Sequence, residues 1–197
     1  MIDLEKLLTF QKERVAEWHT EVKLSATELP WTAIEENHQF NFLLWHEEDI
    51  ARVKNIPDAR IVEAKRNIDH YNQMRNNAME KIDEWVLNYL RVNEIKQADK
   101  MHSETPGMMV DRLSIMALKE YHTQEEVERD DASPEHKAKC EARVNTLKEQ
   151  ISDLKTCLGD VLNQISQGEL RFKVYRQLKM YNDPSLNPQL YKRQSDS

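Results

Sequence analysis

An uninterrupted apolar stripe in the C-terminal half of the chain most constrains its fold. The stripe lies between Ser133-Pro134, a pair typical of a helix start, and Gly168, a residue typical of the position just past a helix end. Its residues recur at alternating steps of four and three: Cys140, Val144, Leu147, Ile151, Leu154, Leu158, Val161 and Ile165. This spacing places them on one face of a long helix. Such a face must be buried against other helices or a second copy, which predicts a helical bundle.

The composition supports this prediction. The chain has 197 residues with 3 Gly, 6 Pro and 32% charged residues, which favours helices with short connections over a sheet rich in turns. Its length is that of one domain. We therefore expect an all-α, single-domain bundle over residues 1–197, with about five long helices, a short C-terminal helix and a frayed tail from about residue 185.

Apolar periodicity and helix-stop residues predict where the helices lie. The expected ranges are about 2–24, 32–56, 58–90, 106–123 and 134–167, with a short helix starting near 170. Thr32 and Glu35 have the spacing of a capping box, and Thr105 before Pro106 indicates another helix start. The helix after Pro106 is apolar nearly all round and is therefore expected to be central.

Charge and hydropathy exclude several classes of function. The net charge of -7 and a pI near 5.6 give no basic field for nucleic acid or an anionic membrane. No apolar run approaches the ~20 residues of a membrane span, and the start has no secretion signal, so a cytoplasmic location is expected. Cys140 and Cys157, on one helix, are expected to be reduced. Phosphate-binding loops and nucleophile motifs are absent, so no cofactor is identified.

The expected helix over 32–56 carries polar side chains on the face that should point inward. Steps of four and three from Ile34 reach His38, Asn41, Trp45, Glu48 and Arg52. The next helix repeats this pattern with polar residues among its apolar face: Asn72, Arg75 and Asp83, with Asn76 at the edge. Because a buried polar group without a partner costs about 1–3 kcal/mol, these groups must pair with one another, with water or with a ligand. They therefore form either a structural network or a binding site.

The leading functional hypothesis is a site for a small sugar-like or phosphorylated molecule, with or without its turnover. In it Arg52 and Arg75 hold the anion, while Glu48, Asp83 and His38 contact hydroxyl groups and are the candidate catalytic residues. His46 is a second candidate general base. The remaining candidate ligand-binding residues are Asn41, Asn72, Asn76, Arg112, Lys119, Arg176 and Lys179. The alternative is a non-catalytic scaffold that binds a partner or a second copy through the apolar stripe.

Metal binding has weaker support in the sequence. Glu35 and His38 form one Glu-x-x-His pair, but Asp99 and His102, the other such pair, have the wrong acid for a di-iron bundle and lie at an expected helix end. The acidic patch HEED at 46–49 spreads around its helix. No metal ligands are therefore assigned.

Several segments together resemble one known family. They are NFLLWHEEDIAR at 41–52, IDHYNQMRNNAMEKID at 68–83, ETPGMMVDRLSIMALKEYH at 104–122 and FKVYRQLKMYNDPSLNP at 172–188. They are similar to the bacterial domain of unknown function family 4254, over most of the chain. The resemblance implies a single helical domain of bacterial origin and no established activity.

Overall fold

The computed structural model describes residues 1–96, 98–176 and 183–190. Its helices are α1 (Leu4–Trp18), α2 (Trp31–Ile50), α3 (Asp58–Val92), α4 (Pro106–Glu128) and α5 (Pro134–Ser166). Within the described residues, extended pairing is limited to an isolated bridge between Met101 and Arg171. The predicted all-α class is confirmed, and none of the described helices is long and apolar enough to cross a membrane.

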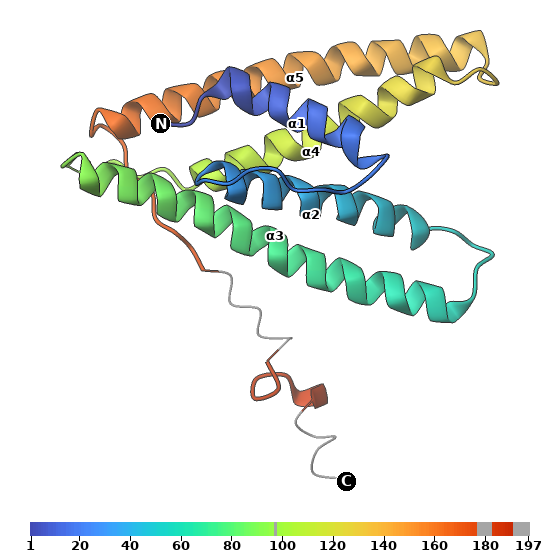
Figure 1. Cartoon of the computed structure of the whole chain (residues 1–197), viewed down its shortest axis with the longest axis horizontal. Helices are drawn as coiled ribbons and strands as arrows, with labels where there is room; N and C mark the ends of the chain where they lie inside the picture. Colours follow the sequence, from blue (N-terminus) through green and yellow to red (C-terminus); the bar gives the residue numbers. More distant parts are fainter. Residues whose placement is uncertain (97, 177–182, 191–197) are drawn as a thin grey trace.

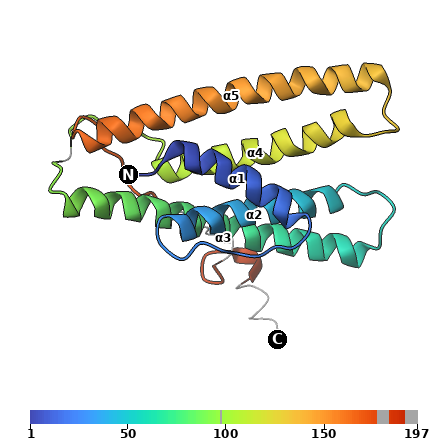
Figure 2. The ribbon, with the colours of Figure 1, turned by 45° about the horizontal axis from the view of Figure 1, so that its top comes forward.

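The helices form two antiparallel pairs with one helix laid across them. α2 pairs with α3, α4 pairs with α5, and α1 covers α4 and α2 (Figure 1). The two pairs are most clearly separated in the turned view (Figure 2). α4 packs against each of the other four helices. Its apolar residues, spread around the helix, are what allow it to be central, as predicted.

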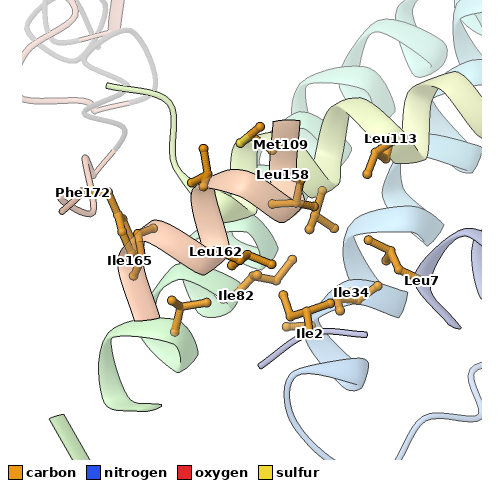
Figure 3. Close-up of a cluster of buried hydrophobic side chains, with 14 of the residues drawn as sticks. Ile2, Leu7, Ile34, Ile82, Met109, Leu113, Leu158, Leu162, Ile165 and Phe172 are labelled. Carbon is orange, nitrogen blue, oxygen red and sulfur yellow. The ribbon is translucent and has the colours of Figure 1, made fainter. Parts of the chain in front are cut away.

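The main hydrophobic core lies where all five helices meet. Leu7 of α1, Ile34 of α2, Ile82 of α3, Leu113 of α4 and Leu158 of α5 are essentially inaccessible to solvent there (Figure 3). Burying each such side chain is worth about 1.5–3 kcal/mol. Most of the α5 stripe is thus covered by the chain's own helices, and these buried side chains do not offer a free surface to a partner.

Helix ends follow the predicted chemistry at two starts and one end. The Thr105 hydroxyl accepts from the Met108 N–H at 3.2 Å, and the Ser133 hydroxyl accepts from the His136 N–H at 3.2 Å. Gly168, just past α5, has a φ of 72°, a left-handed conformation that glycine adopts without strain.

The predicted capping box of α2 is wrong. The helix begins after Pro30, without a side-chain cap, and Thr32 lies inside it. The buried Glu35 carboxylate instead accepts hydrogen bonds from the backbone N–H groups of Ser25 and Ala26, at 2.9 and 2.7 Å. These bonds tie the connection before α2 to the bundle. α1 ends at Trp18, earlier than predicted, and this connection takes up the residues that follow.

The short C-terminal helix does not begin near residue 170. Residues 172–176, after the bridge at Arg171, are not helical, and residues 177–182 lie outside the described part of the chain. Among the described residues that follow, 188–190 form a helical turn. The Arg171 N–H donates to the Lys100 carbonyl at 2.9 Å, and its own carbonyl accepts from the His102 N–H at 2.8 Å. Phe172 is buried in the main core. These tertiary bonds and the burial of one aromatic ring outweigh the local helical pattern.

Candidate functional site

A cleft with a volume of about 330 Å³ opens between α2, α3 and α4. Five of the residues predicted from the sequence line it: Asn41, Glu48, Arg52, Asn72 and Arg75. The other lining residues are Leu44, Trp45, Asp49, Ile115 and Leu118. The cleft therefore combines an apolar wall with convergent amide, carboxylate and guanidinium groups, which is typical of small-molecule sites.

The α2 side of the cleft runs from the interior to the surface. Asn41 is buried, whereas the side chains of Glu48 and Arg52 are 43% and 68% exposed and form an ion pair of 2.7 Å. The prediction that Glu48 and Arg52 point into the protein interior is wrong. α2 ends at Ile50, so Arg52 lies beyond the last helical turn, at the mouth of the cleft.

Arg75 of α3 is the most enclosed cation of the cleft, with a side chain 26% exposed. Its Nε lies 3.6 Å from the buried Asp111 carboxylate of α4, too far for a hydrogen bond. That Nε is also inaccessible to solvent and has no hydrogen-bond partner among the described residues. Arg75 therefore has charge compensation but incomplete hydrogen bonding.

Behind the cleft, Asp111 and Ser114 of α4 organise a buried polar network. The Asp111 carboxylate accepts from the side-chain amides of Asn37 and Asn41, both at 2.9 Å. The Asn41 amide also donates to the Ser114 hydroxyl at 2.9 Å. Sequence reasoning did not assign Asp111 or Ser114 to the site. A carboxylate within a helix that is apolar nearly all round was the signal that could have identified Asp111.

His38 belongs to this network and not to the cleft. Its Nε2 lies 2.8 Å from the Gln11 carbonyl and its Nδ1 lies 2.7 Å from the Ser114 hydroxyl. A carbonyl only accepts, so Nε2 carries the proton and Nδ1 accepts from the hydroxyl. Burial lowers the pKa of His38 to about 4, which keeps the ring neutral. His38 thus has structural partners on both nitrogens and no contact with the cleft.

Asp83 lies at a different place, against the start of α4. Its carboxylate accepts from the Gly107 N–H at 2.6 Å, where the positive end of the helix dipole stabilises negative charge. Burial nevertheless raises its pKa to about 6. The structure does not bring together the three candidate catalytic residues, because His38 and Asp83 do not line the cleft that Glu48 borders.

The other predicted ligand-binding residues also lie outside the cleft. Asn76 is buried on α3. Arg112 and Lys119 line a separate pocket between α4 and α5, where Arg112 pairs with Glu104 at 2.8 Å. Arg176 forms ion pairs with two glutamates of α3, Glu80 and Glu84. Lys179 lies outside the described residues.

The opposed pKa shifts of His38 and Asp83 predict a specific pH dependence. His38 has a folded pKa below its ordinary 6.5, so its stabilising effect is full above pH 6.5 and is lost as the pH falls towards 4. Asp83 has a folded pKa above its ordinary 3.8, so its effect has the opposite sign: stability grows as the pH falls through 6. In the wild-type chain the two effects largely cancel between pH 6.5 and 4.

Asp83→Asn removes the titration of Asp83 and leaves that of His38, while an oxygen acceptor for the Gly107 N–H remains. Relative to the wild type, its free energy of unfolding is expected to fall by roughly 3 kcal/mol between pH 7 and pH 4. Urea unfolding of both proteins at several pH values measures the difference. Parallel pH profiles of the two proteins would show that Asp83 does not titrate in this range.

Comparison with known proteins agrees with the resemblance noted in the sequence. The family model described as "Protein of unknown function (DUF4254)" matches residues 31–174, which span α2 to α5 and every residue that lines the cleft. No curated protein and no solved structure matches the chain. The chain belongs to the DUF4254 family of proteins of unknown function.

Proposed function

We propose that the cleft binds a small, sugar-like molecule that carries one phosphate or carboxylate group. The observation that carries this proposal is the Arg75 side chain, which lines the cleft, is 26% exposed and forms no hydrogen bond through its Nε among the described residues. A planar guanidinium matches the geometry of a phosphate or carboxylate, and it binds such groups through two parallel hydrogen bonds. Arg75 is the cleft cation least exposed to competing water.

The other lining groups suit the uncharged part of such a ligand. Asn41 and Asn72 supply amide groups, and Glu48 and Asp49 supply acceptors for hydroxyl groups. Trp45 adds apolar aromatic surface to the cleft wall, against which a sugar ring can pack. Two carboxylates and two guanidiniums line the cleft, so its formal charge is balanced and a ligand with a single anionic group fits better than a polyanion.

Arg75→Ala tests the proposal directly. A panel of sugar phosphates, nucleotide sugars and sugar acids is screened by thermal shift, and hits are titrated by calorimetry. We expect at least one hit, with affinity about 10–100-fold weaker in Arg75→Ala, because a charge-assisted hydrogen bond is worth about 1.5–3 kcal/mol. Arg75→Lys should recover part of the lost affinity, since lysine keeps the positive charge but cannot form the two parallel hydrogen bonds of a guanidinium.

Arg112→Ala is the matched control, because it removes an arginine from the pocket on the other side of α4. It should leave the affinity unchanged. A panel without hits, or equal losses in Arg75→Ala and Arg112→Ala, would contradict the proposed site.

A further inference from the structure

Three histidines from separate helices converge at one end of the bundle. His19 caps the C-terminus of α1, His46 belongs to α2 and His122 belongs to α4. Their ring centroids lie 5.3 Å (His19 to His46), 5.1 Å (His19 to His122) and 5.6 Å (His46 to His122) apart. One ring nitrogen from each lies within 4.8 Å of the others. Residues far apart in the sequence are thus gathered at a single point.

Hydrogen bonds to Nδ1 orient two of these rings and select one neutral tautomer for each. The His19 Nδ1 lies 2.7 Å from the Val15 carbonyl, and the His122 Nδ1 lies 2.8 Å from a Glu125 carboxylate oxygen. Both oxygens accept, so in the neutral ring each Nδ1 carries the proton and each Nε2 offers a lone pair. Histidines that bind metals are held in this way, with the second nitrogen donating to a carbonyl or carboxylate.

The Nε2 of His122 is a buried nitrogen, inaccessible to solvent, that lacks a hydrogen-bond partner among the described residues. As a bare acceptor in a shielded position it is destabilising unless something binds it. A purely structural aromatic cluster leaves this atom unexplained.

Aromatic side chains pack around the three rings. Trp45 stacks on His122 at 4.7 Å, Tyr121 stacks on His19 at 4.6 Å, and Phe42 packs edge-on against His46 at 4.5 Å. Burial, and next the proximity of the other two histidines, lowers the pKa of His46. The aromatic shell also excludes water from one side of the cluster.

We propose that His19, His46 and His122 bind a divalent transition-metal ion, with Zn²⁺ as the ion that their chemistry fits best. Zinc accepts imidazole ligands at about 2.0–2.1 Å, which places ligand nitrogens about 3.4 Å apart in a tetrahedron. The nitrogens of the observed cluster lie within 4.8 Å of one another, so binding of the ion draws them closer together. Three histidines leave the fourth position open to water or a small ligand, as in catalytic zinc sites. The site consists of other residues than the proposed anion cleft, although Trp45 borders both.

The full chain, freed of metal with a chelator, is titrated with Zn²⁺ by calorimetry and with Co²⁺ by visible absorption. We expect one ion per chain and the absorption bands of four-coordinate Co²⁺. His19→Gln, His46→Gln and His122→Gln should each weaken binding by more than about 100-fold, because losing a second-shell partner alone costs about 10–100-fold. His70→Gln, at an exposed position on α3, is the matched control and should bind as the wild type does.

Glu125→Gln distinguishes a positioning role from a ligand role. It should weaken Zn²⁺ binding about tenfold and leave the shape of the Co²⁺ spectrum unchanged, because the three nitrogen ligands remain. Circular dichroism confirms that each variant is folded. If His122→Gln does not fold, His19→Gln decides, since His19 is exposed at a helix end. A wild-type chain that binds neither ion, or folded cluster variants that bind as tightly as His70→Gln, would overturn the proposal.

Discussion

Gly107→Ala is expected to destabilise the protein by roughly 3 kcal/mol, a large effect for a single methyl group. The start of α4 passes so close to α3 that a Cβ at Gly107 would lie 2.3 Å from the Met79 carbonyl oxygen and 3.0 Å from an Asp83 carboxylate oxygen. Because the nearest atom belongs to the backbone of α3, a rotamer change cannot relieve the clash. The two helices must separate, which also disturbs the hydrogen bond from the Gly107 N–H to Asp83.

Gly159→Ala provides the matched control within the same chain. At this position on α5 the new Cβ would lie 3.3 Å from the Cδ1 atom of Leu4, the end of a flexible side chain. Alanine also favours a helix over glycine by about 1 kcal/mol, so this variant should be neutral or slightly stabilising. Urea unfolding of both variants gives the comparison. Similar midpoints for the two would refute the close approach of α3 and α4.

Asp111→Ala is expected to cost about 3–5 kcal/mol, because two buried amide donors lose their acceptor at about 1–3 kcal/mol each and a partly exposed arginine loses its counter-charge. The substitution leaves the side-chain amides of Asn37 and Asn41 without their shared acceptor and Arg75 without its nearest compensating charge. Water cannot easily replace the carboxylate, because Asp111 is 6% exposed. The same change should loosen the floor of the cleft.

Two variants separate charge from geometry at this position. Asp111→Asn keeps an oxygen acceptor but loses the charge, and about half of the destabilisation is expected. Asp160→Ala removes an exposed carboxylate from α5 and should change stability by less than about 0.5 kcal/mol. The free energy of unfolding, measured in urea at pH 7, ranks the three. If Asp111→Ala behaves as Asp160→Ala does, the network contributes nothing to stability.

Local patterns in the sequence predicted the helices well where the signal was local. The starts of α4 and α5 depend on a hydroxyl and a proline, and both were correctly placed. The capping box of α2 was mispredicted because Glu35 bonds to a connection that precedes its helix, a partner that spacing alone does not reveal. The helix expected near residue 170 was mispredicted for the same reason, since Arg171 bonds instead to the backbone of Lys100 and His102.

The candidate site was predictable in composition but not in arrangement. Helical spacing predicted that Asn41, Glu48 and Arg52 share one face of a helix, and all three line the cleft, although Arg52 lies beyond the end of α2. Spacing does not specify where along the helix burial ends, so Glu48 and Arg52 were expected to be buried. Spacing also does not reveal hydrogen-bond partners on other helices, so His38 was assigned to a site although both of its nitrogens have structural partners. The three-histidine cluster could not be predicted from the sequence, because α1, α2 and α4 each contribute one histidine and no spacing motif connects them.

The central helix α4 contributes residues to the cleft, to the buried polar network and to the three-histidine cluster. This helix carries Ile115 and Leu118, which line the cleft, and Asp111 and Ser114, which lie behind it. Towards its C-terminal end it also carries His122 of the three-histidine cluster. A translation of α4 along its axis would displace all of them together. Any such movement that favours an occupant of the cleft changes the affinity of the histidine cluster for its ion, and thermodynamic reciprocity makes that influence equal in both directions.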